Sequence, residues 1–356
     1  MRLTMLAAVA LLVLTSGSCA SSSGEDVALN SHEVHADGSI TFRYRDTGAS
    51  QVEVSVEGLK TPLAMTKADG IWSATTPPLP PEIYWYWFIV DGRTQMDPLN
   101  DSVIPNSAYL NNLVTVHGPT PQLWEFTDVP HGVLHHHFYK SEIERDVPTG
   151  YVDYYVYTPP GYESNAEPYP TLYLLHGDGE TAADWTVIGG ANFILDNLIA
   201  QGKAKPMIVV MPFSYGTVDV AARSVVHEIL PQVEAAYRVV KKRDSRAVAG
   251  LSKGAMESLE IAFQQPDLFG WVGSFSAGDM LHGDPPLLAD PEKIDFRLLW
   301  ISCGTDDALI TPNRELVVML KENDFAVTAV ETPGAHTFVV WHDNLIHFAQ
   351  LLFQDE

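Results

Sequence analysis

The hydrophobic and polar positions of this chain follow two different patterns before and after about residue 118. In residues 30–118, short segments of β type are separated by turn signals that recur about every ten residues, and helical periodicity is absent. The expected strands are Ser39–Arg45, Gln51–Val56, Ile71–Thr75 and Ile83–Val90. This pattern predicts a small β-sandwich.

Beyond a linker that contains Gly118-Pro119-Thr120-Pro121, expected strands and helices alternate. The strands are Tyr151–Thr158, Thr171–Leu175, Met207–Met211, Arg246–Ala249, Trp271–Phe275 and Leu298–Cys303. The helices are Phe193–Ala200, Ser224–Tyr237 and Met256–Phe263. The alternation predicts an α/β fold whose largely parallel sheet is covered on both faces, with active residues at the carboxyl ends of its strands.

Residues 1–20 have the features of an export signal. Arg2 precedes the apolar run Leu3–Leu14, which is shorter than the ~20 residues that a bilayer span needs. Ser18-Cys19-Ala20 fits a signal peptidase site, whereas Cys19 with the small residues after it resembles a lipoprotein start, although Ser16 replaces the usual aliphatic residue. We expect export to the periplasm or the medium, and a lipid anchor at Cys19 is the alternative.

Length, charge and cysteine content refine this picture. A chain of 356 residues is expected to form two domains. We assign residues 21–29 to a tether, 30–118 to the β-sandwich, 119–130 to the linker and 131–356 to the α/β domain. The net charge of −24 argues against nucleic acid or an anionic membrane as a partner and suits a neutral substrate such as a polysaccharide. With two cysteines in all, we expect no disulfide framework, and a buried, inert Cys303.

One short stretch carries the chemistry. Ala247-Val248-Ala249-Gly250-Leu251-Ser252-Lys253-Gly254 combines an apolar strand with Gly-x-Ser-x-Gly, and a helical segment follows. This is the layout of a nucleophile elbow, in which a strained serine sits at a sharp strand-to-helix turn. Side chains at Gly250 and Gly254 are expected to clash with the neighbouring strand and helix. The pentapeptide alone is a weak signal, because a tight turn can match it by chance.

A serine nucleophile needs a base and an acid that orients the base, and both occur later in the chain. The expected strand Leu298–Cys303 ends in Gly304-Thr305-Asp306-Asp307, and His336 stands in a late loop before the final helix. A different candidate, the triplet His135-His136-His137, is a poor metal site, because consecutive side chains of a strand point to opposite faces. We therefore expect no metal.

Several motifs resemble those of the carbohydrate esterase family 1 group, which contains bacterial feruloyl and acetyl-xylan esterases as well as enterochelin esterases and mycolyltransferases. The matching motifs are Tyr155-Val156-Tyr157-Thr158-Pro159-Pro160-Gly161-Tyr162, Tyr173-Leu174-Leu175-His176-Gly177, Asp196-Asn197-Leu198-Ile199-Ala200, Pro206-Met207-Ile208-Val209-Val210-Met211-Pro212, Gly250-Leu251-Ser252, Cys303-Gly304-Thr305-Asp306-Asp307 and Gly334-Ala335-His336. The resemblance implies an α/β-hydrolase fold for this domain.

The first domain resembles the immunoglobulin-like, starch-binding-related module of such esterases. The matching pieces are Glu33-Val34-His35-Ala36-Asp37-Gly38, Gly70-Ile71-Trp72, Val90-Asp91-Gly92 and Asp97-Pro98. In glycan-binding relatives, exposed aromatic side chains stack on sugars. Here Trp85 and Trp87 alternate with Tyr84 and Tyr86, so both faces of that strand are apolar. We expect one face in the core and the other against the α/β domain, and a sugar-binding platform is the alternative.

The resemblance implies a role for each matching residue. Ser252 is the nucleophile and His336 the general base. The acid is Asp307, which precedes the small-then-leucine pair, with Asp306 as its competitor. The backbone N–H groups of Lys253 and Asp178 form the oxyanion hole. No metal or organic cofactor is needed. Trp185 and Asn192 match positions close to the active site, where they either contact substrate or serve structure.

Two departures from the family pattern affect the expected substrate. Lys253 stands where relatives usually have methionine, and we expect its side chain to extend into solvent rather than to select an anionic substrate. Pro212-Phe213-Ser214 replaces the usual Pro-Asn-Gly beside the site. We expect an exported serine carboxylesterase that removes feruloyl or acetyl groups from plant polysaccharide. The alternatives are a siderophore esterase, an acyltransferase and a non-catalytic glycan-binding protein.

Overall fold

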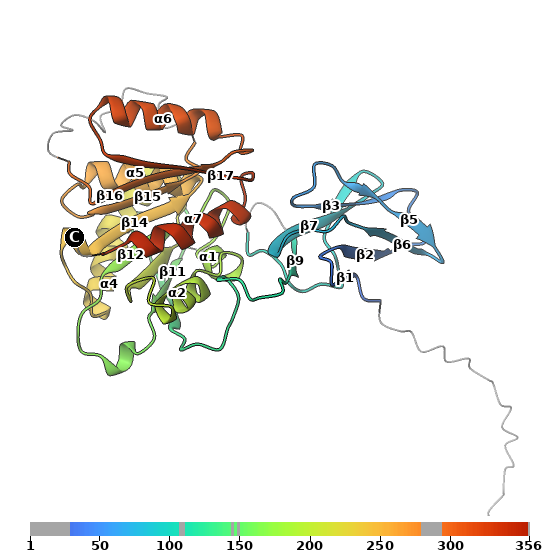
Figure 1. Cartoon of the computed structure of the whole chain (residues 1–356), viewed down its shortest axis with the longest axis horizontal. Helices are drawn as coiled ribbons and strands as arrows, with labels where there is room; N and C mark the ends of the chain where they lie inside the picture. The colour runs from blue at the N-terminus through green and yellow to red at the C-terminus, as the bar shows by residue number, and fades with distance from the viewer. Residues whose placement is uncertain (1–28, 107–110, 144–145, 148–149, 279–293, 355–356) are drawn as a thin grey trace, which may run out of the picture.

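The computed structural model describes residues 29–106, 111–143, 146–147, 150–278 and 294–354, so the predicted export signal and Cys19 lie outside it. Figure 1 shows a smaller, all-β part formed by the first strands and a larger part in which helices flank one sheet. In the described ranges, no helix combines the length and the hydrophobicity that a membrane span requires.

The N-terminal part contains two antiparallel sheets, as the alternating pattern predicts. One sheet is formed, in spatial order, by β1 (His32–Val34), β2 (Ile40–Arg45), β6 (Ile71–Thr75) and β5 (Thr66–Ala68). The other contains β4 (Leu63–Ala64), β3 (Val52–Val56), β7 (Glu82–Val90) and β8 (Arg93–Gln95), with β9 (Asn112–Val116) also paired to β7. Asp91 and Gly92 both have positive φ, as a two-residue hairpin turn between β7 and β8 requires.

The central strand β7 is apolar on both faces, and both faces are at least partly buried. Tyr84, Tyr86 and Phe88 are buried in the core between the two sheets. Ile83 and Trp85 point the other way and pack against the hydrophobic core of the larger part. The expected packing of this face against the larger part is therefore seen for Trp85, in the first half of β7. The described aromatic residues within 30–118 are buried or partly buried, and Trp87 is among the partly buried ones.

The larger part is built on one eight-stranded sheet. Its strands, in spatial order, are β10 (Val133–Tyr139), β11 (Val152–Thr158), β13 (Ile208–Pro212), β12 (Thr171–Leu175), β14 (Arg246–Leu251), β15 (Trp271–Phe275), β16 (Leu298–Gly304) and β17 (Val327–Thr332). The six strands from β13 to β17 are mutually parallel, whereas β11 pairs antiparallel with both of its neighbours. The predicted, largely parallel sheet is thus confirmed.

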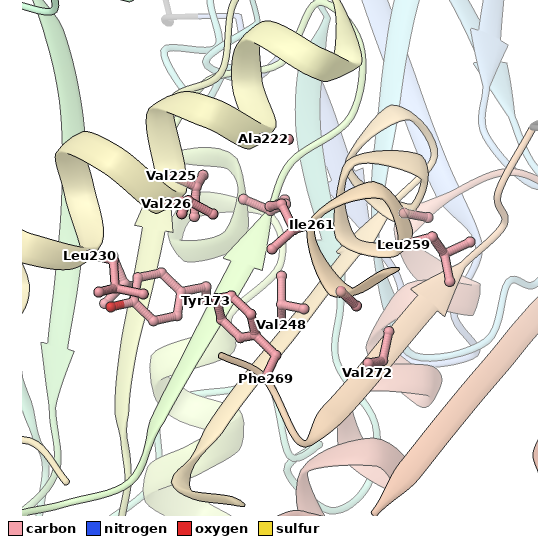
Figure 2. Close-up of a cluster of buried hydrophobic side chains, with 14 of the residues drawn as sticks. Tyr173, Ala222, Val225, Val226, Leu230, Val248, Leu259, Ile261, Phe269 and Val272 are labelled. Carbon is pink, nitrogen blue, oxygen red and sulfur yellow. The ribbon is translucent and has the colours of Figure 1, made fainter. Parts of the chain in front are cut away.

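Helices cover both faces of this sheet. One face carries α3 (Val218–Ser224), α4 (Leu230–Ala236), α5 (Lys253–Gln264) and α6 (Ile310–Glu322), and the other carries α1 (Asp184–Val187), α2 (Ala191–Ala200) and α7 (Phe338–Leu351). Short helical turns occur at η1 (Tyr162–Ser164) and η3 (Arg243–Ser245). Figure 2 shows the first face, where Val248 and Val272 of the strands meet Leu259 and Ile261 of α5.

The helical region that includes the predicted helix Ser224–Tyr237 begins six residues earlier. Thr217 caps the start of α3, because its side-chain oxygen accepts a hydrogen bond from the backbone N–H of Val220. The helix then passes through the π-helical segment η2 (Val225–Ile229) into α4. It ends before Tyr237, whose backbone is extended.

A buried hydrogen bond joins the two parts. Glu82, at the start of β7, lies 2.9 Å from Nδ1 of His342 on α7, and Nε2 of the same ring lies 2.8 Å from the carbonyl oxygen of Ile188. His342 is 2% exposed and Glu82 6%. Nδ1 of the buried His342 ring therefore has its hydrogen-bond partner in the N-terminal part.

We expect Glu82→Ala to lower the free energy of unfolding by about 2 kcal/mol or more, because it leaves a buried imidazole nitrogen without its partner. Urea unfolding followed by fluorescence measures this. Glu53→Ala is the matched control, since Glu53 is a half-buried acid on β3 of the same sheet. Equal stability of the two variants would contradict the importance of this contact.

Candidate active site

Ser252 lies at a sharp turn between β14 and α5. Its φ of 53° and ψ of −118° place a non-glycine residue in a strained conformation. A Cβ at Gly254 would lie 2.4 Å from the carbonyl oxygen of His176, and a Cβ at Gly250 would lie 2.5 Å from the backbone of Gly254. The predicted need for both glycines is confirmed. The strand, the strained serine and the helix have the geometry of a nucleophile elbow.

The structure brings the three predicted catalytic residues together. Nε2 of His336 is 2.9 Å from Oγ of Ser252, and Nδ1 of the same ring is 2.7 Å from Oδ2 of Asp307. Ser252 follows β14, Asp307 follows β16 and His336 follows β17, so parallel strands deliver all three to one edge of the sheet. This geometry allows the imidazole to accept the serine proton while the carboxylate orients the ring.

The two neighbouring aspartates differ in environment. Asp307 is 2% exposed, and its Oδ1 also accepts the backbone N–H of Leu309 at 2.8 Å, whereas the side chain of Asp306 is exposed. Burial alone would raise the pKa of Asp307, but the hydrogen bonds from His336 and Leu309 hold that pKa below its usual value. Asp307 is therefore the carboxylate that can act with His336.

Two supporting residues were missed by the sequence analysis. Ser276 follows β15 with a positive φ of 59°, and its side chain hydrogen-bonds Asp307. The indole N–H of Trp341 donates to Oγ of Ser276 at 3.2 Å, and the Trp341 ring packs edge-on against His336. Ser276 comes directly after a predicted strand, so its position at the same sheet edge was a usable signal.

The predicted solvent exposure of the Lys253 side chain is wrong. It is 13% exposed, and its Nζ lies 3.4 Å from Oε1 of Glu257, which is fully buried one helical turn along α5. Oγ of Ser214 also lies 3.2 Å from that carboxylate oxygen. The helical spacing of four residues brings the lysine back over its own helix, where the acid can compensate its charge.

The structure does not support substrate contact by Trp185 or Asn192. Trp185 is 1% exposed, its indole N–H donates to the carbonyl oxygen of Leu175 at 3.0 Å, and its ring packs edge-on against Phe275 and Phe338. Asn192 is buried at the start of α2. Neither residue belongs to the lining of the cavity beside Ser252. Their structural role, the stated alternative, fits these positions.

A cavity of about 100 Å³ lies beside Ser252 and His336, and both parts of the chain line it. The larger part contributes Gly177, Asp178, Glu180, Ile188, Thr337, Phe338 and Trp341, and the N-terminal part contributes Glu57, Trp85 and Asn106. The contribution of the N-terminal part was missed by the sequence analysis. No local pattern marks Glu57, because its approach to Ser252 depends on how the two parts pack.

Two carboxyl groups of this cavity are kept protonated by burial. Burial raises the pKa of Glu57 to about 8 and the pKa of Glu180 to about 8, and nearby acids, Glu82 and Asp184 respectively, add to the rise. Oε2 of Glu180 accepts the backbone N–H of Gly177 at 2.7 Å. At neutral pH both groups therefore present neutral carboxyls rather than negative charge.

The predicted Pro212-Phe213-Ser214 loop does border the site. Phe213, Ser214, Tyr215 and Lys253 line a second hollow of about 280 Å³, and Asp178 and Glu180 belong to the lining of both hollows. The rings of Phe213 and Tyr215 lie roughly parallel at 6.4 Å, and Tyr215 is 40% exposed. The loop is fixed to the sheet because the Ser214 N–H donates to Nε2 of His176, whose pKa burial lowers to about 4.

The other sequence candidates have structural partners. His135, His136 and His137 lie on β10 and contact three different residues, namely Thr158, Asp153 and Tyr237. Among the described residues, no group of three His, Cys, Asp or Glu side chains could hold a metal. Cys303 is a free thiol in the core, and burial raises its pKa to about 12, which keeps it protonated and unreactive.

Comparison with known proteins shows that this chain is similar to esterases. The family model described as "Putative esterase" matches residues 149–350. The chain is 29% identical over 341 residues to an endo-1,4-beta-xylanase/feruloyl esterase of Xylanibacter ruminicola, which covers 90% of this chain and 46% of the relative. It is 30% identical over 168 residues to an esterase of Mycobacterium tuberculosis, covering 42% of this chain and 34% of that one. The chain thus spans less than half the length of these curated relatives.

Solved structures show the same fold. A ferulic acid esterase of the fungus Anaeromyces mucronatus superposes with a TM-score of 0.57 at 24% identity, over 66% of this chain and 96% of that one. An enterochelin esterase of Shigella flexneri superposes with a TM-score of 0.68 at 18% identity, over 91% of this chain and 95% of that one. The second likeness therefore extends over nearly the whole length of both chains.

We expect Asp307→Asn to lower kcat for ester hydrolysis by about 10³–10⁴-fold, because an amide cannot hold the imidazole in the required tautomer. Asp306→Asn is the matched control and should stay within about threefold of wild type. Steady-state hydrolysis of 4-nitrophenyl acetate measures both. A larger loss in Asp306→Asn would assign the acid to the other aspartate.

We also expect Glu180 to make a contribution to the free energy of unfolding that falls as the pH rises from about 4.5 to 8. Glu180 keeps its proton in the folded state up to about pH 8 but loses it near pH 4.5 when unfolded, so the unfolded state binds fewer protons in this window. Glu180→Gln should flatten this slope by up to about 1.4 kcal/mol per pH unit.

Urea unfolding at several pH values measures the slope. Glu163→Gln, a change at an exposed acid on η1, is the control and should keep the wild-type slope. An unchanged slope in Glu180→Gln would contradict the raised pKa.

Proposed function

Because the chain belongs to the Esterase family, we propose that it is a serine carboxylesterase in which Ser252, His336 and Asp307 form the catalytic triad. The observation that carries the proposal is the continuous hydrogen-bonded chain from Oγ of Ser252 through the His336 ring to Asp307. It occurs at a strained elbow, where the serine side chain faces a cavity that could hold an ester.

The reaction follows from these positions. Oγ of Ser252 attacks the ester carbonyl carbon while Nε2 of His336 takes the hydroxyl proton, and Asp307 stabilises the imidazolium that forms. The tetrahedral intermediate collapses as His336 gives the proton to the leaving alkoxide, which departs as an alcohol. Water then attacks the acyl-enzyme with His336 again as the base, and the acid and free Ser252 are released.

The oxyanion in this mechanism is bound by the backbone N–H groups of Lys253 and Asp178. Lys253 is the first residue of α5, so its N–H is among the donors that a helix leaves unpaired at its start. Asp178 lines the cavity beside Ser252. The neighbouring Gly177 N–H is already donated to Glu180, so Gly177 does not supply the second donor. One donor of this kind typically contributes ~10²–10³ in rate.

The substrates are esters of plant cell-wall polysaccharide or its fragments, from which the enzyme removes feruloyl or acetyl groups. The relative of Xylanibacter ruminicola, whose name includes feruloyl esterase, supports this, because its similarity covers 90% of this chain. Export of the protein, to the periplasm or the medium, fits a substrate of this size. The α/β-hydrolase reaction proposed here requires no metal or organic cofactor.

Three alternatives make different predictions for ester hydrolysis, and the third, a non-catalytic glycan-binding protein, would hydrolyse no ester. A siderophore esterase would share the fold, as the enterochelin esterase of Shigella flexneri does over both parts of the chain. An acyltransferase would use the same triad but pass the acyl group to a sugar. Glycan binding by residues 30–118 stays a prediction, and affinity electrophoresis in xylan or starch tests it.

We expect protein comprising residues 21–356 to hydrolyse methyl ferulate or acetylated xylan faster than a catecholate siderophore, with 4-nitrophenyl acetate as a general ester. Ser252→Ala should lower hydrolysis of each substrate by at least ~10⁴-fold while the protein stays folded. Product analysis with and without an added sugar acceptor distinguishes hydrolysis from acyl transfer.

The preferred substrate and the main product distinguish the esterase proposal from its alternatives. Preference for the siderophore would replace the polysaccharide proposal, and acylated sugar as the main product would indicate a transferase. If wild type and Ser252→Ala were equally inactive on every ester, the esterase proposal would be wrong.

A further inference from the structure

Glu57 is an acid from the N-terminal part that lies in the catalytic cavity. It follows the last residue of β3, its side chain is 8% exposed, and it lines the same cavity as Ser252 and His336. The mechanism above gives it no role. A buried carboxyl that faces a substrate cavity needs a reason to be there, because burying a polar group without a full set of partners costs free energy.

The carboxyl is held in place from both parts of the chain. The backbone N–H of Trp85 donates to its Oε2 at 3.2 Å, and the Glu57 N–H donates to the carbonyl oxygen of Trp85 at 3.0 Å. The hydroxyl of Thr337 also hydrogen-bonds the carboxyl. Thr337 is the neighbour of His336 and the cap residue of α7. Glu57 is thus positioned relative to the triad rather than free to move.

The surroundings determine what this carboxyl can recognise. Trp85, Ile188, Phe338 and Trp341 supply apolar walls to the cavity. Burial keeps the carboxyl protonated at neutral pH, so it offers both an O–H donor and a carbonyl acceptor. A neutral hydroxyl, which also donates and accepts, is the complementary group. Among the described residues that line this cavity there is no Lys or Arg, so an anionic group would find no fixed positive charge there.

We propose that Glu57 is a substrate-binding residue that hydrogen-bonds a neutral hydroxyl carried by the acyl group of the ester. The acyl group has an apolar body that contacts the aromatic walls, with the hydroxyl at the end that reaches Glu57. The proposal rests on the esterase function proposed above and narrows its substrate class. It makes the N-terminal part a contributor to acyl specificity.

A purely structural role makes a different prediction. Glu57 could serve only to complete the pairing of β3 with β7, since it satisfies the Trp85 N–H beyond the end of the strand. In that case its loss would reduce activity equally for all esters. In contrast, a binding role predicts a loss that depends on whether the acyl group carries a hydroxyl, because an unpaired buried polar group penalises the analogue that lacks it.

The test measures kcat/KM for matched esters with and without one hydroxyl. The substrates are methyl 3-hydroxycinnamate, methyl 4-hydroxycinnamate and methyl cinnamate, and the proteins are wild type, Glu57→Gln and Glu57→Leu. We expect wild type to prefer at least one hydroxylated ester by about 3–10-fold. Glu57→Leu should abolish this preference, whereas Glu57→Gln, a neutral group that also donates and accepts, should retain most of it. The ratio of the two rates cancels any general loss of activity.

Glu53→Leu is the control, because Glu53 lies on the same strand and outside the cavity lining. Its preference should equal that of wild type. An unchanged preference in Glu57→Leu, or an equal change in Glu53→Leu, would overturn the proposal. Wild type alone also tests it, since equal rates on all three esters would overturn it even if Glu57→Leu failed to fold.

Different results would contradict the binding role of Glu57 and the esterase function. If wild type hydrolyses the esters, Ser252→Ala does not, and Glu57→Leu keeps the wild-type preference, the esterase function holds and the role of Glu57 is wrong. If wild type hydrolyses none of the panel of esters, including 4-nitrophenyl acetate, the esterase function itself is wrong.

Discussion

The strained backbone of Ser252 is the constraint on which the site depends. The chain leaves β14 and enters α5 within this single residue, which has a positive φ. The turn is possible because Gly250 and Gly254 lack a Cβ, which would clash with the backbone of Gly254 and of His176, respectively. The central position of β14 in the sheet, between β12 and β15, holds the turn from both sides. The apolar cores on the two faces of the sheet supply the stability that such strain requires.

The parallel sheet then converts distant sequence positions into neighbours. Asp307 and His336 follow β16 and β17, so both reach the edge at which Ser252 stands, although 84 residues separate the serine from the histidine. Ser276, which follows β15, reaches the same edge and links Trp341 to Asp307. The supporting contacts therefore come from the same architecture as the triad and restrict the orientation of the carboxylate and the ring.

Two buried acids of the N-terminal part contact α7 and its cap residue. Glu82 binds His342 on α7, and Glu57 binds Thr337 at the start of that helix. Because His336 directly precedes Thr337, the N-terminal part contacts the helix that follows the proposed general base. The two acids thus link the N-terminal part to α7, whose residues Phe338 and Trp341 line the cavity beside Ser252.

Local patterns predicted most of the helices and strands and the candidate reacting groups. The alternation of β7 and the Gly-x-Ser-x-Gly elbow predict structure from neighbouring residues. The rule for parallel sheets places Ser252, Asp307 and His336 at one edge, whereas their roles came from the family resemblance. Only the tertiary structure decided the rest. It distinguished buried Asp307 from exposed Asp306, placed Trp185 in the core, turned Lys253 back onto Glu257 and brought Glu57 into the cavity. Each of these depends on burial or on contact between elements far apart in the chain. Residue type and spacing do not encode such contacts locally, because the same side chain can face solvent, a core or a site according to what packs against it.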